Sequence, residues 1–128
     1  MPKGESLYHE FPDYRVDLEP SGRRVVVRFD GEVVVDTESA LVVRETKHDP
    51  VLYYPRQDVR MRLLERTDHE TFCPFKGEAS YWTLSASGRR DENAVWSYED
   101  PFDQVAGLKD YVAFYPDRVQ VEDPAQGS

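Results

Sequence analysis

Short runs of β-branched residues alternate with turn residues along most of the chain, and this pattern predicts strands. Residues 24–29 and residues 32–36 each contain three consecutive valines. The dipeptide Asp30-Gly31 joins the two runs. Asp-Gly between such runs is a strong hairpin signal, because glycine accepts the positive φ angle that a tight turn needs. We therefore expect a β-hairpin at the start of the ordered domain.

The rest of the chain continues this pattern with few helical signals. Residues 55–59 suit one helical turn, since proline is tolerated at a helix start, and residues 61–65 fit either a strand or an extension of that turn. Only residues 103–110 read as a helix, with Asp103 as a candidate N-cap. Further strands are expected at residues 40–44, 51–54, 79–84, 93–98, 111–115 and 118–121. The chain is thus expected to be mostly β, with two antiparallel sheets and one short C-terminal helix.

The ends of the chain differ from its middle. Residues 1–22 are polar and lack periodicity, so we expect an extended N-terminal arm. Residues 123–128 contain Pro, Gly and Ser and are expected to fray. A chain of 128 residues suits one domain. The single domain is therefore expected over residues 23–122.

Charge and composition narrow the class of partner. A formal net charge of −9 argues against nucleic acid, because phosphate binding normally needs a basic surface. No apolar run reaches the roughly 18 to 20 residues that cross a bilayer, and residues 1–10 lack the pattern of a secretory signal. One cysteine excludes an intramolecular disulfide and suits a reducing compartment. We expect a cytoplasmic protein with no nucleic-acid partner and no membrane partner.

Four motifs in one order resemble a known family. They are Arg44-Glu-Thr46, Tyr53-Tyr-Pro-x-x-Asp-Val59, Thr71-x-Cys-Pro-x-Lys-Gly77 with Tyr81-Trp82, and Asn93-Ala-x-Trp-x-Tyr98 followed by Pro101. Together they resemble the bacterial and fungal family catalogued as domain of unknown function 427, over roughly residues 24–121. The resemblance implies a β-tent type fold, in which two antiparallel sheets meet at an angle. Fold alone does not fix function.

The resemblance carries two further associations that the residues do not support. Many tent domains hold zinc through two Cys-x-x-Cys pairs, which a chain with one cysteine cannot form. The family also has a nucleotidyltransferase-like label, but the chain has no Asp-x-Asp to hold Mg²⁺ against phosphates. The histidines His9, His48 and His69 show no recognised ligand spacing. We expect no metal site and no cofactor.

Cys73 is the first candidate for chemistry. Only the thiolate is a useful nucleophile, and Lys76, three residues further on, is a cation that would favour it. Glu45 is a second candidate, as an acid or a base. The alternative is a small buried cysteine before a turn shaped by Pro74 and Gly77, since free cysteine is among the most buried residue types. Both interpretations stay open.

The motif residues also suggest a ligand site. Arg44 and Glu45 point to opposite faces of a strand, so one of them is expected inside. A buried arginine needs a carboxylate partner such as Asp58 or Glu45, and it would either lock a loop or bind an anion. Large aromatics either fill a core or line a cleft that holds a flat ligand. The site expected between the sheets is lined by Arg44, Tyr54, Lys76, Trp82 and Trp96.

Three classes of function follow. The first is a domain that binds a small anionic or aromatic ligand in this cleft. The second is a cofactor-free enzyme that uses Cys73 with Lys76 or Glu45. The third is a protein-interaction module, and pairing of exposed edge strands into a homodimer is an open alternative because unpaired edges are costly.

Overall fold

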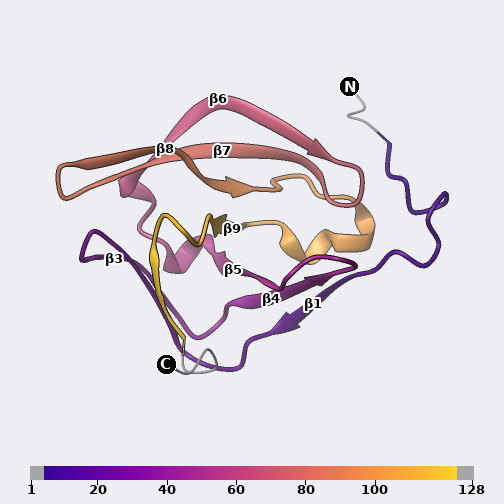
Figure 1. Ribbon diagram of the computed structural model, residues 1–128, viewed down its shortest axis with the longest axis horizontal. Helices are drawn as coiled ribbons and strands as arrows, with labels where there is room; N and C mark the ends of the chain where they lie inside the picture. Colours follow the sequence, from indigo (N-terminus) through magenta and orange to yellow (C-terminus); the bar gives the residue numbers. More distant parts are fainter. Residues whose placement is uncertain (1–4, 124–128) are drawn as a thin grey trace.

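The computed structural model describes residues 5–123, which form two antiparallel sheets (Figure 1). The large sheet has seven strands in the order β1-β4-β5-β9-β8-β7-β6, and the small sheet has three in the order β10-β2-β3. The strands are β1 (Val16–Pro20), β2 (Val25–Phe29), β3 (Glu32–Thr37), β4 (Leu41–Glu45), β5 (Val51–Pro55), β6 (Leu64–Cys73), β7 (Gly77–Ala86), β8 (Arg89–Ser97), β9 (Tyr111–Phe114) and β10 (Gln120–Glu122). The prediction of a mostly β fold with two antiparallel sheets is confirmed.

The predicted hairpin is formed by β2 and β3. Its turn residues Asp30 and Gly31 both have positive φ angles, of 50° and 86°. This is the backbone shape that the Asp-Gly dipeptide favours. The two strands pair in antiparallel register, with one shift between Val27 and Arg28.

Helical structure in the described part of the chain consists of three 3₁₀ segments: η1 (Arg56–Asp58), η2 (Met61–Leu63) and η3 (Asp103–Leu108). The helix expected at residues 103–110 is shorter than predicted, and Phe102 rather than Asp103 precedes its first turn. Asp110 has a positive φ angle of 66°, so a helix cannot continue through it. None of these segments is long and apolar enough to cross a membrane.

The large sheet has a buried cluster on each face. Tyr54 and Trp82 belong to the cluster that fills the space between the two sheets. Tyr53 and Tyr81 belong to a second cluster with Val105 and Leu108 of η3. Since neighbouring residues of a strand point to opposite faces, the adjacent aromatics divide between the two clusters. All four are buried, so none of them is a surface residue.

Parts of both expected chain ends join the fold. Val16–Pro20, placed in the arm from sequence, is the edge strand β1 and pairs with β4. Asp123, placed in the frayed tail, is buried and accepts hydrogen bonds from the Arg23 guanidinium. Residues 1–4 and 124–128 of the expected arm and tail lie outside the described residues.

At the centre of the large sheet, β5 and β9 pair over only a short stretch. Within residues 5–123, β5 pairs with β9 only through Tyr54 opposite Val112 and Pro55 opposite Tyr111. Residues 51–53 use their other edge to pair with β4. No β5–β9 pairing continues between residues 51–53 and the opposite residues 113–115, and we call this stretch the β5–β9 seam.

Candidate functional site

A cavity of about 400 Å³ lies beside β4, β5, β7 and β8. We call it the Lys76 cavity. Its lining combines one lysine and one histidine with acidic, aromatic and valine side chains: Val43, Glu45, His48, Asp49, Val51, Tyr53, Lys76, Tyr81, Trp96, Tyr98 and Tyr115. The cavity therefore has aromatic walls and a small number of charged groups.

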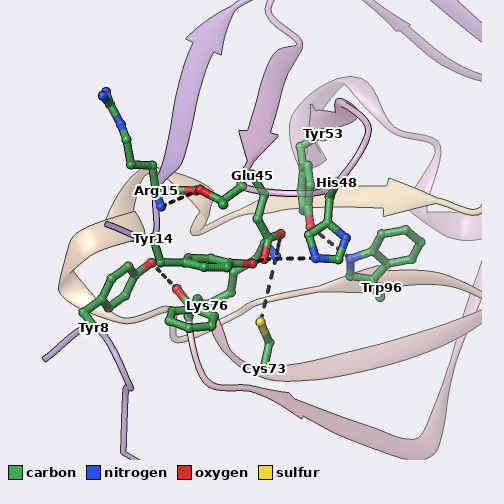
Figure 2. A network of polar contacts seen from close by, with 11 residues as sticks. Tyr8, Tyr14, Arg15, Glu45, His48, Tyr53, Cys73, Lys76 and Trp96 are labelled. Atoms are coloured by element: carbon green, nitrogen blue, oxygen red, sulfur yellow. Dashed lines mark hydrogen bonds and ion pairs between the residues drawn. The ribbon is translucent and has the colours of Figure 1, made fainter. Parts of the chain in front are cut away.

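Lys76 and Glu45 form an ion pair in the wall of this cavity (Figure 2). The Lys76 ammonium donates to Glu45 Oε1, and the two side chains are only 10% and 11% exposed. The same ammonium lies 3.9 Å from Cys73 Sγ and 5.9 Å from the centre of the Tyr98 ring. Because its charge is compensated by Glu45, the cavity presents a cation and an anion side by side.

The turn between β6 and β7 directs Lys76 inward. Cys73 and Gly77 pair across this turn, and the Lys76 amide donates to the Cys73 carbonyl at 3.2 Å. Gly77 has a φ angle of +118°, and a Cβ there would lie 3.3 Å from the Asp100 carbonyl oxygen. Only glycine fits such a backbone without strain. The interpretation of Gly77 as a residue that shapes the turn agrees with this geometry.

The N-terminal segment contacts the ion pair from outside the cavity lining. Tyr14 donates its hydroxyl to Glu45 Oε2, and its ring stacks on Phe75 with centroids 3.7 Å apart. Tyr8 donates to the Phe75 carbonyl, and the Leu7 amide donates to the Pro74 carbonyl at 3.0 Å. Figure 2 shows Tyr8 and Tyr14 on the side of Lys76 away from Trp96.

The surroundings of Tyr8 and Tyr14 raise the pKa of both hydroxyl groups. Burial raises the pKa of Tyr14, and the hydrogen bond to Glu45 adds to this effect. Burial also raises the pKa of Tyr8 to about 12, with Cys73 and Glu45 contributing. Both hydroxyls are therefore protonated near neutral pH and remain hydrogen-bond donors.

The aromatic wall is held by its own polar contacts. The Trp96 indole N–H donates to the Tyr53 hydroxyl at 3.1 Å, and Tyr115 lies against Trp96 with ring centroids 4.6 Å apart. The Tyr81 hydroxyl hydrogen-bonds with Thr71 Oγ1 at 3.0 Å. Burial raises the pKa of Tyr53. The wall is thus an ordered set of rings with neutral hydroxyl groups.

The structure brings three of the predicted site residues, Glu45, Lys76 and Trp96, to one cavity. Cys73 is half-buried next to it. Arg44 lies on the outer face of β4, where it pairs with Glu19 at 3.1 Å. Of the two neighbours, Glu45 is the one that points inward.

The other two predicted residues lie elsewhere. Tyr54 lines a second cavity of about 280 Å³, on the opposite face of β5 from Tyr53. Trp82 packs in the core between the sheets, and the guanidinium groups of Arg56 and Arg66 each lie 5.4 Å from its ring centre. Neither residue lines the Lys76 cavity.

The sequence interpretation missed several lining residues, of which Tyr53, His48 and Tyr115 are examples. Strand alternation separates Tyr53 from Tyr54, but the pairing of Val51 with Val43, which places the Tyr53 face beside Glu45, is known only from the structure. Tyr14 gave no signal, since its contact with Glu45 joins positions 31 residues apart. Within residues 5–123, no group of three or more His, Cys, Asp or Glu side chains is placed to hold a metal ion.

The fold and cavity define a small two-sheet β domain, and a comparison with protein families gives its family. The family described as Domain of unknown function (DUF427) matches residues 17–124. This match covers most of the chain, so the protein belongs to that family. Among curated proteins, none matches the chain. The family match begins after Tyr14, so the segment that contacts Glu45 from outside precedes the matched region.

Proposed function

We propose that the Lys76 cavity binds a small, flat, uncharged molecule that presents a hydrogen-bond acceptor beside a donor. The observation that carries this proposal is the Lys76–Glu45 pair within aromatic walls. Lys76 offers N–H groups and Glu45 offers a carboxylate, so a primary amide or a ring lactam complements both. An anionic ligand is less suitable, because Glu45 would repel it.

The cost of the buried pair supports a role beyond stability. Removing two charges from water is unfavourable, and a well-packed apolar pair is often as stable. The cavity of about 400 Å³ also falls within the range of small-molecule sites, roughly 300 to 1,000 Å³. Such sites typically combine apolar walls with a few polar groups, as this one does.

Fluorescence titration tests the proposal. The chain has two tryptophans, of which Trp96 lines the cavity, so Trp82→Phe leaves one reporter at the site. Benzamide and nicotinamide, which carry an acceptor beside a donor, should change Trp96 emission in a saturable way. Benzoate, the matched anion, should bind more weakly. Tighter binding of benzoate, or saturation by none of the three, would contradict the proposal.

A matched pair of double variants locates the binding. Lys76→Met with Glu45→Gln removes both charges of the buried ion pair and should weaken benzamide binding about tenfold, or about 1.4 kcal/mol. Arg44→Met with Glu19→Gln removes an exposed ion pair from the outer face of β4 and should leave binding unchanged. Equal effects of the two double variants would place the ligand elsewhere.

A second candidate function is an enzyme that uses Cys73. The specific observation is the 3.9 Å distance between Lys76 Nζ and Cys73 Sγ, since a nearby cation favours the thiolate. Rapid alkylation by iodoacetamide near neutral pH, slowed by Lys76→Met, would support it. Alkylation only after denaturation would count against it. The free thiol also supports a proposed cytoplasmic location, because thiols persist in a reducing compartment.

Association through edge strands is a weaker candidate. The edge strands of the large sheet are β1 and β6. β1 ends in Pro20, and β6 is mostly exposed and charged with a register shift between Arg66 and Glu70. Proline, charges and bulges protect edges from pairing. Light scattering in solution should therefore report a monomer, and a stable dimer would favour the interaction module instead.

A further inference from the structure

The second cavity, of about 280 Å³, has a different character from the Lys76 cavity. We call it the apolar cavity. Leu52, Phe114, Val119 and Val121 contribute to its lining, which contains no charged side chain. It lies between the centre of the large sheet and β10 of the small sheet. It is partly open to solvent, so it is a pocket beside the core rather than a packing void.

The two cavities lie on opposite faces of the same strands. Along β5, Tyr53 lines the Lys76 cavity and Leu52 lines the apolar cavity. At the end of β9, Tyr115 lines the first and Phe114 lines the second. A continuous sheet would keep such cavities apart, because its backbone ladder fills the space between its faces.

The β5–β9 seam removes this separation. Val51 and Trp96 line both cavities, although the cavities lie on opposite faces. Val51 lies in the stretch of β5 that does not pair with β9. The Trp96 indole is held beside this stretch by its hydrogen bond to Tyr53, as Figure 2 shows. The two cavities thus share part of their lining at the seam.

We propose that the two cavities form one bipartite site, and that its ligand is elongated. This inference rests on the proposed function of the Lys76 cavity. The ligand's flat polar head binds at Lys76 and Glu45, and its unbranched apolar tail passes Val51 and Trp96 through the seam into the apolar cavity. The apolar lining gives the tail its affinity, and the ion pair fixes which end enters which cavity.

A series of para-alkyl benzamides, from methyl to hexyl, tests the bipartite site. Binding is measured by the Trp96 fluorescence titration in the Trp82→Phe background. Each methylene group that is buried should lower the dissociation constant by up to about fourfold. The dissociation constant should therefore fall stepwise as the chain lengthens, and the gain should stop when the apolar cavity is full.

Filling the apolar cavity provides the decisive variant. Val121→Phe on β10 should abolish the gain from the alkyl chain while benzamide itself binds as before. Val119→Phe fills the same cavity from the preceding loop and serves as a second variant in case the first is unstable. Val26→Phe is the matched control, because Val26 lies on β2 between Asp36 and Glu122 and does not line the cavity.

The outcomes separate this inference from the proposed function. Loss of the chain-length gain in Val121→Phe or Val119→Phe, with the gain retained in Val26→Phe, supports the bipartite site. If benzamide binds but longer chains gain nothing, or gain equally in the filled variants, the bipartite site is wrong and the proposed function stands. If neither benzamide nor its alkyl derivatives bind, both are wrong.

Discussion

The hydroxyl of Tyr14 and the carboxylate of Glu45 are joined by a hydrogen bond that links the N-terminal segment to the candidate site. The ring of Tyr14 stacks at the same time on Phe75, one residue before Lys76. Tyr14 lies outside the family match, yet it contacts both Glu45 and the residue that precedes Lys76. Its contribution can be measured separately from that of Lys76.

Tyr14→Phe should reduce the free energy of unfolding by about 1.5 kcal/mol, because it removes one hydrogen bond to a charged acceptor. The stacked ring is retained, so the loss reports the hydroxyl alone. Denaturant unfolding followed by circular dichroism is the measurement. Phe11→Leu, which changes another ring on Phe75 without any link to Glu45, is the control and should have a smaller effect. Equal stability of Tyr14→Phe and the natural chain would contradict the role of this contact.

The Lys76–Glu45 pair predicts a strongly non-additive double-mutant cycle. Lys76→Met alone leaves Glu45 buried without its cation and should cost about 3 to 5 kcal/mol of stability. Adding Glu45→Gln removes the isolated charge, so the double variant should recover most of that loss. Chemical unfolding of the two single variants and the double variant gives the coupling energy. Simple addition of the two single losses would show that the pair is not energetically coupled.

Gly77→Ala should destabilise the chain by on the order of 3 kcal/mol, because it combines an unfavourable φ angle with a close backbone neighbour. The φ angle is +118° and the Asp100 carbonyl oxygen lies 3.3 Å from the added Cβ. Gly88→Ala is the matched control: its φ angle is +77° and nothing lies within 4 Å. It should cost only about 1 kcal/mol. Thermal unfolding of both variants checks the order, and a larger loss in Gly88→Ala would be inconsistent with the described turn.

The tyrosines predict loss of stability in strong alkali. Burial raises the pKa of Tyr115, aided by a hydrogen bond with Tyr81, to about 12, and it also raises the pKa of Tyr98. An unfolded tyrosine ionises near pH 10. Since the folded chain holds these protons more tightly, their contribution is complete below pH 10 and is lost as the pH rises through 12.

Near-ultraviolet absorbance and circular dichroism, recorded together, check this alkaline transition. Tyrosinate absorbance should rise steeply above pH 10, and the β signal should disappear over the same interval. A full tyrosinate signal near pH 10 with an intact β spectrum would contradict the raised pKa values of Tyr98 and Tyr115.

Local signals account for most of the fold. The valine runs and Asp30-Gly31 determine a hairpin through neighbouring residues alone, and the structure has it. The helix predicted at residues 103–110 is too long, because Val105 has non-helical backbone angles and Lys109, with a ψ angle of 136°, already leaves the helical conformation. Strand order in the large sheet depends on contacts between distant segments, so no local pattern could give it.

The candidate site was predictable only in part. Strand alternation shows that Arg44 and Glu45 face opposite ways, but it cannot say which one is buried. The buried cluster on the inner face of β4 decides in favour of Glu45. The same alternation separates Tyr54 from Tyr53 and Trp82 from Tyr81, and the sequence interpretation chose the members that belong to the other face. Because both faces of the large sheet are buried, residue type alone cannot show which aromatic of each pair faces the Lys76 cavity.

The β5–β9 seam also has a mechanical consequence. It divides the large sheet into a half with β1, β4 and β5 and a half with β9, β8, β7 and β6. The backbone joins the halves through the Tyr54 and Pro55 pairings. A further hydrogen bond runs from the Arg56 amide N–H to the Asp110 carbonyl at 2.9 Å. With so few backbone hydrogen bonds at the seam, side-chain bonds carry much of the connection: Trp96 of one half donates to Tyr53 of the other, and Lys76 pairs with Glu45. The residues that line the Lys76 cavity thus also hold the two halves of the large sheet together.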